Sequence, residues 1–415
     1  MSKQKITRLA SVACGAEVFL KSRLDLVSGA RLGLITNPTG VDGNMTSLID
    51  RFRDHERIHL TALFGPEHGV RGTAEAGEFV PFATDAVTGL PVYSLYGQDQ
   101  AGGPDTGISR DEIMRAFDTR PEGKGPVDAM LRDLDVLVLD LQDVGTRVYT
   151  YLATMAYAMQ ACARLGLRFL VLDRPNPLKG TAMEGPVLRY PEFSSFVGLY
   201  PIPLRHGMTL GELAGLFNSH FFEKKCDLSV IPMQGWKRDM WYDQTGLSWI
   251  SPSPNLPTLE TALVYPGQVF WEGTNISEGR GTTQPFLQCG APWIEGHRAA
   301  AHLNRMDLPG IRFREVWFQP AWSKYRAESC SGIRLHVTDR NRYRPWETTL
   351  HIMQLFMTMY PEKLRFYPEY FDRIMGTDEV REALNQQISV AEIVNGFQAD
   401  LIRFAEFRKS HLLYA

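Results

Sequence analysis

The fold class is decided by one stretch, Leu134-Asp135-Val136-Leu137-Val138-Leu139-Asp140-Leu141. Its apolar side chains follow one another almost without interruption, which is typical of a strand buried on both faces and hence of a parallel sheet. A polar loop, Gln142 to Arg147, comes next, and after it apolar residues recur at a helical period until Gly166. A strand, a loop and a helix in this order predict an α/β fold.

The same alternation continues on both sides of this stretch. Further strands are predicted at residues 31–36, 58–64, 91–96, 167–172 and 228–232, and helices at 46–53 and from Thr209 to about Phe222. Thr46 is the expected cap of the first helix, and Thr209 with Glu212 forms a capping box for the second. Three polar loops follow strands, at residues 65–72, 142–147 and 173–176. Because parallel strands end on one edge of their sheet, we expect these loops to converge.

The length of 415 residues is too great for one ordinary core, so two domains are expected. Helical and strand periodicity is lost near Gly235, where tryptophans cluster. We therefore predict a parallel-sheet domain over residues 1–235 and a smaller α+β domain over residues 236–415 that closes a cleft. The second domain is expected to contain a strand at 331–339, a helix at 346–359 and a helical end at 390–408.

Composition excludes several classes of protein. A net charge of −3 offers no electrostatic case for nucleic acid or an anionic membrane surface. No run of about 18 apolar residues exists, and the apolar segment after the basic start is shorter than the roughly seven residues of a signal peptide. The five scattered cysteines form no C-x-x-C pair, which argues against disulfides and a zinc site. We expect a cytoplasmic protein without a metal.

The sequence also lacks the glycine-rich loops that usually bind nucleotide phosphates, because neither G-x-G-x-x-G after a strand nor G-x-x-x-x-G-K-[ST] is present. The loop Gly65-Pro66-Glu67-His68-Gly69-Val70-Arg71-Gly72 instead displays a carboxyl, an imidazole and a guanidinium on a backbone stiffened by proline. Such a loop suits a small-molecule site. It is equally consistent with a turn whose charges are solvated or paired with each other.

Glycine-framed loops carry a set of carboxylates: Glu67, Asp140, Asp143, Asp173, Glu272 and Glu278. Glycoside cleavage needs one carboxyl that stays protonated near neutral pH and an anion or substrate group that supports the oxocarbenium-like centre. This set can supply both. The alternatives are helix caps and ion pairs, and Asp140 with Asp143 could cap the helix that follows them. The two are three residues apart, whereas a haloacid-dehalogenase-type phosphatase has its aspartates two apart.

Several blocks together resemble the exo-β-N-acetylmuramidase family NamZ from about Gly15 to the C-terminus; they lie at residues 34–40, 64–72, 90–97, 140–147, 172–177, 205–209 and 272–283. The resemblance implies a Rossmann-like N-terminal domain without a dinucleotide site, a smaller C-terminal domain and a cleft between them. It further implies removal of terminal N-acetylmuramic acid from the non-reducing end of peptidoglycan fragments, with Glu67 as the catalytic residue.

Roles for the other residues are hypotheses built on this resemblance. Glu67 is the general acid. His68 either orients Glu67 or contacts the sugar. Asp143 or Glu278 positions water or the 2-acetamido group. Arg280 or Arg71 reads the lactyl carboxylate of muramic acid, because a guanidinium binds a carboxylate in bidentate fashion. The candidate sugar-binding residues are Arg147, Asn176, Asn275 and Thr282. The alternatives are an exo-lyase acting on the same sugar and a non-catalytic muropeptide-binding protein.

Overall fold

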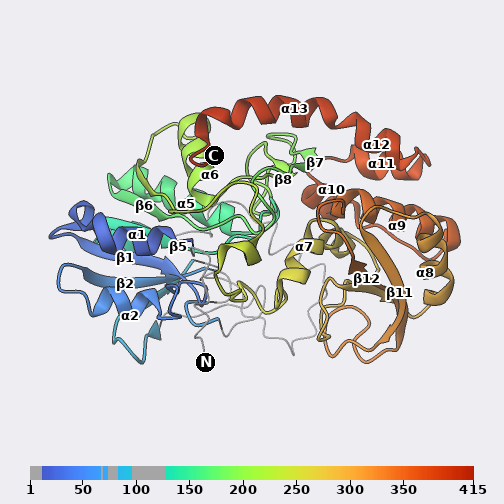
Figure 1. Cartoon of the computed structure of the whole chain (residues 1–415), viewed down its shortest axis with the longest axis horizontal. Helices are drawn as coiled ribbons and strands as arrows, with labels where there is room; N and C mark the ends of the chain where they lie inside the picture. The colour runs from blue at the N-terminus through green and yellow to red at the C-terminus, as the bar shows by residue number, and fades with distance from the viewer. Residues whose placement is uncertain (1–11, 67–68, 73–82, 96–127) are drawn as a thin grey trace, which may run out of the picture.

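A computed structural model describes residues 12–66, 69–72, 83–95 and 128–415 of the chain. Two lobes lie side by side, and each contains its own sheet (Figure 1). The larger sheet has seven strands in the order β3-β4-β2-β1-β5-β6-β9. Its strands, in chain order, are β1 (Arg31–Thr36), β2 (His59–Gly65), β3 (Ala83–Thr84), β4 (Pro91–Ser94), β5 (Val136–Asp140), β6 (Arg168–Leu172) and β9 (Asp227–Ile231). All neighbours pair in parallel except β3 with β4, which confirms the predicted parallel sheet and α/β class.

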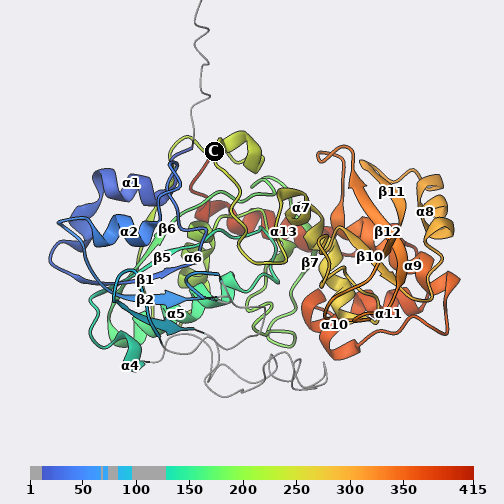
Figure 2. The same cartoon turned by 90° about the horizontal axis from the view of Figure 1, so that it is seen from below.

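Strand β5 lies inside this sheet, between β1 and β6, and is buried along its whole length. Val136 and Val138 belong to the apolar cluster under α1 and α2, whereas Leu137 and Leu139 belong to the cluster under α5 and α6. Figure 2 shows α1 and α2 on one side of the sheet and α5 on the other. The near-continuous apolar run is therefore explained by helices that cover both faces. These helices are α1 (Gly15–Ser22), α2 (Leu48–Arg53), α5 (Tyr151–Leu165) and α6 (Leu210–His220).

Helix ends in this lobe follow the sequence signals closely, with one exception. Gly166 ends α5 with a left-handed φ of 73°, and the capping box of Thr209 and Glu212 opens α6. The prediction that Thr46 caps α2 was wrong, because Ser47 accepts the hydrogen bond from the backbone N–H of Ile49. Short elements complete the lobe: η1 (Leu24–Val27) and α4 (Asp128–Leu131).

The second lobe has an antiparallel sheet in the order β10-β12-β11. The strands are β10 (Gln288–Ala291), β11 (Ile311–Phe318) and β12 (Cys330–Val337). The helices of this lobe are α7 (Leu259–Gln268), α8 (Gly296–Arg305), α9 (Pro345–Met359), α10 (Pro368–Met375), α11 (Glu379–Asn385) and α12 (Val390–Gly396), with the short η4 (Val269–Gly273). Helix α13 (Gln398–Phe407) leads back to the first lobe, where η5 (Arg408–His411) lies against α6 and η3 (Tyr242–Thr245) bonds to Val12. This composition confirms the predicted α+β character.

A hairpin of β7 (Glu184–Val187) and β8 (Pro203–Arg205) lies between the lobes and was not predicted from its proline-rich sequence. Helix α13 crosses from the second lobe back to the first, where the C-terminus lies beside α6 (Figure 1). One continuous apolar cluster contains Met155 of α5 and Trp346 of α9. The two lobes thus share a core, and a boundary at residue 235 stays a prediction. None of the helices in the described ranges combines the length and apolar character that a bilayer crossing requires.

Candidate active site

The loops that follow β1 and β5 meet where the strand order of the large sheet reverses. The chain runs from β1 to β2 and β4 on one side and then returns to β5 on the other side of β1. Ligands of open α/β sheets bind beyond the carboxyl ends of the strands at this point. Here the Gln142 backbone N–H donates to Thr39 Oγ1 at 3.1 Å, and the Thr39 hydroxyl donates to Asn37 Oδ1 at 2.6 Å. The two loops therefore form one connected rim.

Asp143 and His206 face each other at this rim, and both are buried. The Gly145 backbone N–H donates to Asp143 Oδ2 at 2.7 Å, and His206 Nε2 lies 3.5 Å from the same oxygen. His206 Nδ1 accepts from the Met208 backbone N–H at 3.2 Å. Because Nδ1 is an acceptor, the proton of the neutral ring is on Nε2, directed at Asp143. Asp143 was predicted for the site, whereas His206 was not.

Four buried polar atoms at the rim lack a hydrogen-bond partner within the described part of the chain: Gln142 Oε1, Asp143 Oδ1, Thr146 Oγ1 and His206 Nε2. Buried polar groups in native proteins are almost always hydrogen-bonded to protein or to water. Several such atoms on two adjoining loops are therefore the arrangement expected where a polar ligand or ordered water completes the bonding. This unsatisfied set is the strongest structural indication of a binding site at the strand ends.

The second lobe contributes a cluster of charges around Arg280. Arg280 donates from Nε and Nη2 to Glu272 Oε1 at 3.0 and 2.7 Å, and its Nε lies 3.6 Å from Glu278 Oε1. Lys324 Nζ donates to Glu278 Oε2 at 2.9 Å. Burial opposes the charge of Arg280, but Glu272 and Glu278 together raise the pKa of the guanidinium above its ordinary value. The cluster is thus a fixed network of two cations and two anions.

Aromatic contacts connect this cluster to the loop after β5. The Arg280 guanidinium lies over the Phe286 ring, 5.0 Å from its centroid. The Phe286 ring meets Tyr265 edge-on at 4.9 Å, and Tyr265 meets Tyr149 at 6.1 Å. Tyr149 is the second residue after the 142–147 loop. A series of ring contacts therefore connects the Arg280 cluster to the residues that follow the 142–147 loop, and the assignment of both to one site stays a prediction.

Two other predicted arginines have partners in the chain itself. Arg71 makes a bidentate pair with Asp85, from Nε to Oδ1 at 3.0 Å and from Nη2 to Oδ2 at 2.9 Å. Arg147 is buried and donates only to backbone carbonyls, from Nη1 to Pro186 and from Nη2 to Met375, among others. Burial lowers the pKa of Arg147 to about 9. Arg147 thus joins the β7–β8 hairpin to the end of α10, and we leave it out of the proposed substrate contacts.

The predicted amide and hydroxyl ligands likewise hold the backbone of their own loops. Asn176 donates to the Met208 carbonyl at 2.9 Å and accepts from the Leu178 N–H. Asn275 donates to the Lys363 carbonyl at 2.8 Å and accepts from the Arg365 N–H. The Thr282 hydroxyl donates to the Gly279 carbonyl at 2.6 Å. The contacts of Asn275 and Thr282 shape the loop that carries Arg280, whereas those of Asn176 join the loop after β6 to the segment that carries His206.

Glu67 and His68 lie outside the described residues. On either side of them, the backbone at Gly65 lies close to the backbone at Gly69, since a Cβ added to Gly65 would come within 2.9 Å of the Gly69 Cα. Only glycine fits such an approach. Gly65 also ends β2, so the loop leaves the same edge of the sheet as the loops after β1 and β5.

Metal binding has no support within the described ranges, where no three His, Cys, Asp or Glu side chains come together in a way that could hold an ion. All five cysteines are free and buried.

The fold and the strand-end rim define a two-lobed α/β protein with a polar site at the carboxyl edge of its parallel sheet. The chain belongs to the NamZ family: the model for the N-terminal part of exo-β-N-acetylmuramidase NamZ matches residues 32–260, and the C-terminal model matches residues 263–414. The family resemblance inferred from the sequence is thereby confirmed.

The relatives match over nearly the whole chain. The peptidoglycan β-N-acetylmuramidase NamZ of Bacillus subtilis is 44% identical over 414 residues, which is 100% of this chain and 94% of the relative. The crystal structure of a DUF1343 family protein from Bacteroides fragilis is 36% identical, with a TM-score of 0.86 over 98% of this chain and all of that one. A second such structure from the same organism is 30% identical, with a TM-score of 0.74 over 97% and 99%.

Proposed function

We propose that the protein is an exo-β-N-acetylmuramidase that removes terminal N-acetylmuramic acid from the non-reducing end of peptidoglycan fragments. The observation that carries this proposal is the full-length 44% identity to a peptidoglycan β-N-acetylmuramidase. The unsatisfied polar set at the strand ends supports it, because a sugar offers both hydrogen-bond donors and acceptors to such groups.

Glu67 is assigned the role of general acid in this proposal. It follows β2 in the loop that leaves the ligand-binding edge of the sheet, and a carboxyl there can protonate the departing glycosidic oxygen. Asp143, together with His206, is assigned to positioning the 2-acetamido group or water, since Asp143 Oδ1 and His206 Nε2 are buried without partners in the described chain.

Arg280 is assigned to the lactyl carboxylate that distinguishes muramic acid from glucosamine. Glu272 and Glu278 fix its orientation from two sides, which lowers the entropy cost of binding a carboxylate. Glu278 is itself fixed by Lys324, so we assign it a positioning role for the guanidinium. Arg71 stays the alternative for this role, because it pairs with Asp85 through Nε and Nη2 just as Arg280 pairs with Glu272.

The test is turnover of a chromogenic β-glycoside of N-acetylmuramic acid by the Glu67→Gln variant. We expect a loss of at least about a hundredfold in kcat with an unchanged thermal midpoint, because the amide cannot donate an acidic proton. Glu56→Gln is the matched control, since Glu56 is exposed just before the opposite end of β2. Near-normal turnover by Glu67→Gln would remove Glu67 from the acid role.

Mass spectrometry of the released sugar separates hydrolysis from elimination. Hydrolysis yields N-acetylmuramic acid with one water added across the cleaved bond, whereas a lyase product is lighter by one water. Binding of the glycoside without any product would indicate a muropeptide-binding protein instead. The expected cytoplasmic location stays a prediction, which fractionation of the producing cells can check.

A further inference from the structure

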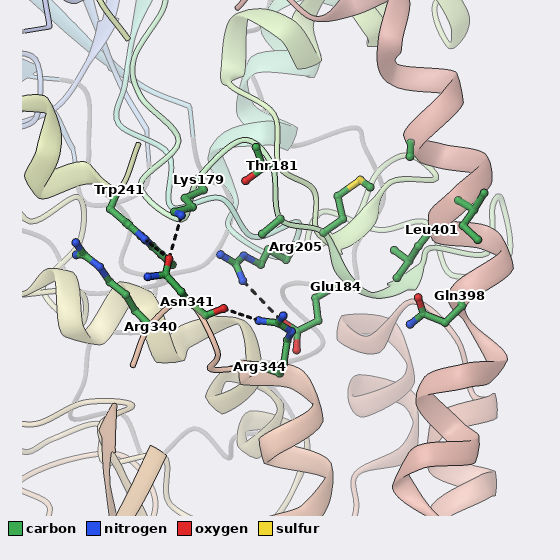
Figure 3. Close-up of a pocket in the computed structure, with 14 residues that line it drawn as sticks. Lys179, Thr181, Glu184, Arg205, Trp241, Arg340, Asn341, Arg344, Gln398 and Leu401 are labelled. Atoms are coloured by element: carbon green, nitrogen blue, oxygen red, sulfur yellow. Dashed lines mark hydrogen bonds and ion pairs between the residues drawn. The ribbon is translucent and has the colours of Figure 1, made fainter. Parts of the chain in front are cut away.

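A cavity of about 450 Å³ lies between the lobes (Figure 3), and its lining contains none of the rim residues Gln142, Asp143, Thr146 and His206. Its walls come from the segment around β7 and β8, from the loop before α9 and from α13. Ligand pockets of small molecules have volumes of this order, about 300–1,000 Å³. Arg205 and its neighbour His206 separate the two sites, because Arg205 lines the cavity while His206 faces Asp143.

Four cationic side chains line this cavity: Lys179, Arg205, Arg340 and Arg344. Arg340 is neutralised by Asp243, whose two carboxylate oxygens both lie 2.9 Å from its Nη1. Arg205 Nη1 lies 3.8 Å from Glu184 Oε2, the one carboxylate in the lining. Lys179 donates to the neutral Asn341 amide oxygen at 3.0 Å, and Arg344 Nη1 donates to backbone carbonyls of residues 341–343. In the described chain, Lys179 and Arg344 thus have no carboxylate within ion-pair distance, although the charge of Arg344 acts on Glu184.

The cations are held in place by rigid neighbours. Trp241 is buried, and its ring lies 5.0 Å from Lys179 Nζ, 5.0 Å from the Arg340 guanidinium and 5.9 Å from that of Arg205. The Trp241 indole N–H and Lys179 Nζ both donate to Asn341 Oδ1. Figure 3 shows Lys179 and Trp241 meeting at Asn341, with Arg344 and Arg205 on the side of Glu184. A ligand would therefore find Lys179 and Arg205 already oriented, whereas Arg344 is an exposed side chain.

Buried polar atoms in the lining are incompletely bonded. Arg205 is 3% exposed, yet its Nε has no hydrogen-bond partner among the described residues, and neither does Glu184 Oε2. Glu184 Oε1 accepts from the backbone N–H of Trp346 and Glu347 at the start of α9. Burial raises the pKa of Glu184 to about 7, against the opposing effects of Arg205 and Arg344 and of the backbone N–H groups of Trp346 and Glu347.

The wall formed by α13 is apolar. Leu401, Ile402 and Ala405 line the cavity from this helix, and Ile402 is 64% exposed. A polar ion surrounded by water would not require such a surface. The combination of two cations that have no ion-pair partner in the described chain with an aliphatic wall favours a molecule that is charged at one end and apolar at the other.

We propose that this cavity is a second binding site, which takes a small molecule bearing two carboxylate or phosphate groups beside an apolar portion. The anionic groups bind Lys179 and Arg344, and the apolar portion packs on α13. Carboxylates of an acidic peptide and phosphate esters share this chemistry, and direct binding measurements distinguish them. The site does not depend on the glycosidase proposal, since its occupancy is measured without turnover.

The experiment is isothermal titration calorimetry of the full chain with two probes, N-acetyl-alanyl-glutamate and inorganic phosphate. We expect one of them to bind with a dissociation constant below about 1 mM, and Arg344→Gln or Lys179→Gln to weaken it at least about tenfold through loss of a charge-assisted hydrogen bond. Arg342→Gln is the matched control: Arg342 is exposed and close in sequence to Arg344 but does not line the cavity. The neutral N-acetyl-alanyl-glutamine amide should not bind.

The outcomes of the titration either support or overturn a second binding site in this cavity. Binding of the dipeptide that Arg344→Gln weakens and Arg342→Gln leaves unchanged supports a site for acidic peptides. The same pattern with phosphate alone supports a site for phosphate esters. Absence of heat for both probes up to about 10 mM, or equal effects of Arg344→Gln and Arg342→Gln, overturns the proposal.

Discussion

Asp143 is the predicted site residue whose surroundings suggest a direct role most clearly. It is buried, one oxygen is held by the Gly145 N–H, and the other has no partner in the described chain. His206 approaches from a segment 63 residues later, with its Nε2 proton directed at the carboxylate. The contact of 3.5 Å is longer than a strong hydrogen bond, which leaves room for both groups to bond to a ligand.

Asp143→Asn is expected to lower kcat on the muramic acid glycoside about a hundredfold while KM changes little. The amide oxygen can still accept from the Gly145 N–H, so the loop keeps its shape, but the negative charge beside His206 is lost. Steady-state kinetics and a thermal melt should be measured together, with Asp25→Asn at an exposed position as control. A fall in activity that merely follows a fall in thermal midpoint would contradict a role in positioning.

The arginines show where prediction from sequence reaches its limit at this scale. Arg280 and Arg71 were both expected to read a carboxylate because a guanidinium suits one. The sequence could not show that Asp85 lies in the fork of Arg71, or that Glu272 and Glu278 flank Arg280. Which charged side chains form an ion pair depends on which loops the fold brings together. The residue types of the site were thus predictable, whereas their pairing was not.

Elements with a strong periodic pattern were predicted with bounds close to those observed. Strand β5 and helix α5 are long and apolar, and local hydrophobicity alone defines them. The hairpin of β7 and β8 was missed, because Pro186, Pro201 and Pro203 argue against a strand. It forms because it is short and because Arg147 supplies hydrogen-bond donors to its carbonyls. This contribution comes from a distant loop and leaves no local signal in the sequence.

Arg147→Met is expected to lower the free energy of unfolding by about 3 kcal/mol or more, because it leaves buried carbonyls without donors. The affected carbonyls belong to Pro186 and Ile202 near the hairpin and to Ile374 and Met375 at the end of α10. Urea unfolding at neutral pH measures the effect. Arg164→Met serves as control, because Arg164 is largely exposed and has one surface ion pair with Asp128. Equal stability of the two variants would refute the bridging role of Arg147.

The two lobes of the whole molecule are joined by contacts that the sequence did not predict. The last helical segment returns to the parallel-sheet lobe, where Arg408 Nη1 donates to the carbonyls of His206 and Gly207. Tyr414 donates from its hydroxyl to Asp173 Oδ2, and the Arg238 backbone N–H donates to the Ala415 carbonyl at 3.0 Å. The C-terminal segment thereby supports the backbone of the residue that faces Asp143.

The carboxyl of Asp173, which accepts a hydrogen bond from Tyr414, makes the free energy of unfolding depend on pH. Burial raises its pKa to about 6, against the hydrogen bonds from Tyr414, Thr209 and the Gly211 N–H. The folded protein therefore holds the proton more tightly than the unfolded chain does, and this contribution to stability falls as pH rises from about 4 through 6. Between about pH 4.5 and 7.5 the wild-type protein should lose about 2 kcal/mol of unfolding free energy relative to Asp173→Asn.

Urea unfolding at several pH values tests this expectation, with Asp25→Asn as the exposed control. The difference in unfolding free energy between wild type and Asp173→Asn should change across this interval, whereas the difference for the control should stay constant. A difference for Asp173→Asn that is the same at every pH would show that the carboxyl is ionised normally.

The return of the C-terminal segment also determines when the protein can fold during its synthesis. Asp173 and Tyr414 are 241 residues apart, so the ribosome must add every residue between them before the two can meet. Until then the nascent parallel-sheet lobe leaves the ribosomal tunnel with the contacts to Arg408, Tyr414 and Ala415 still missing. Messages that break off shortly before these codons should therefore yield products that chaperones and proteases recognise, although almost every residue of both sheets has been made.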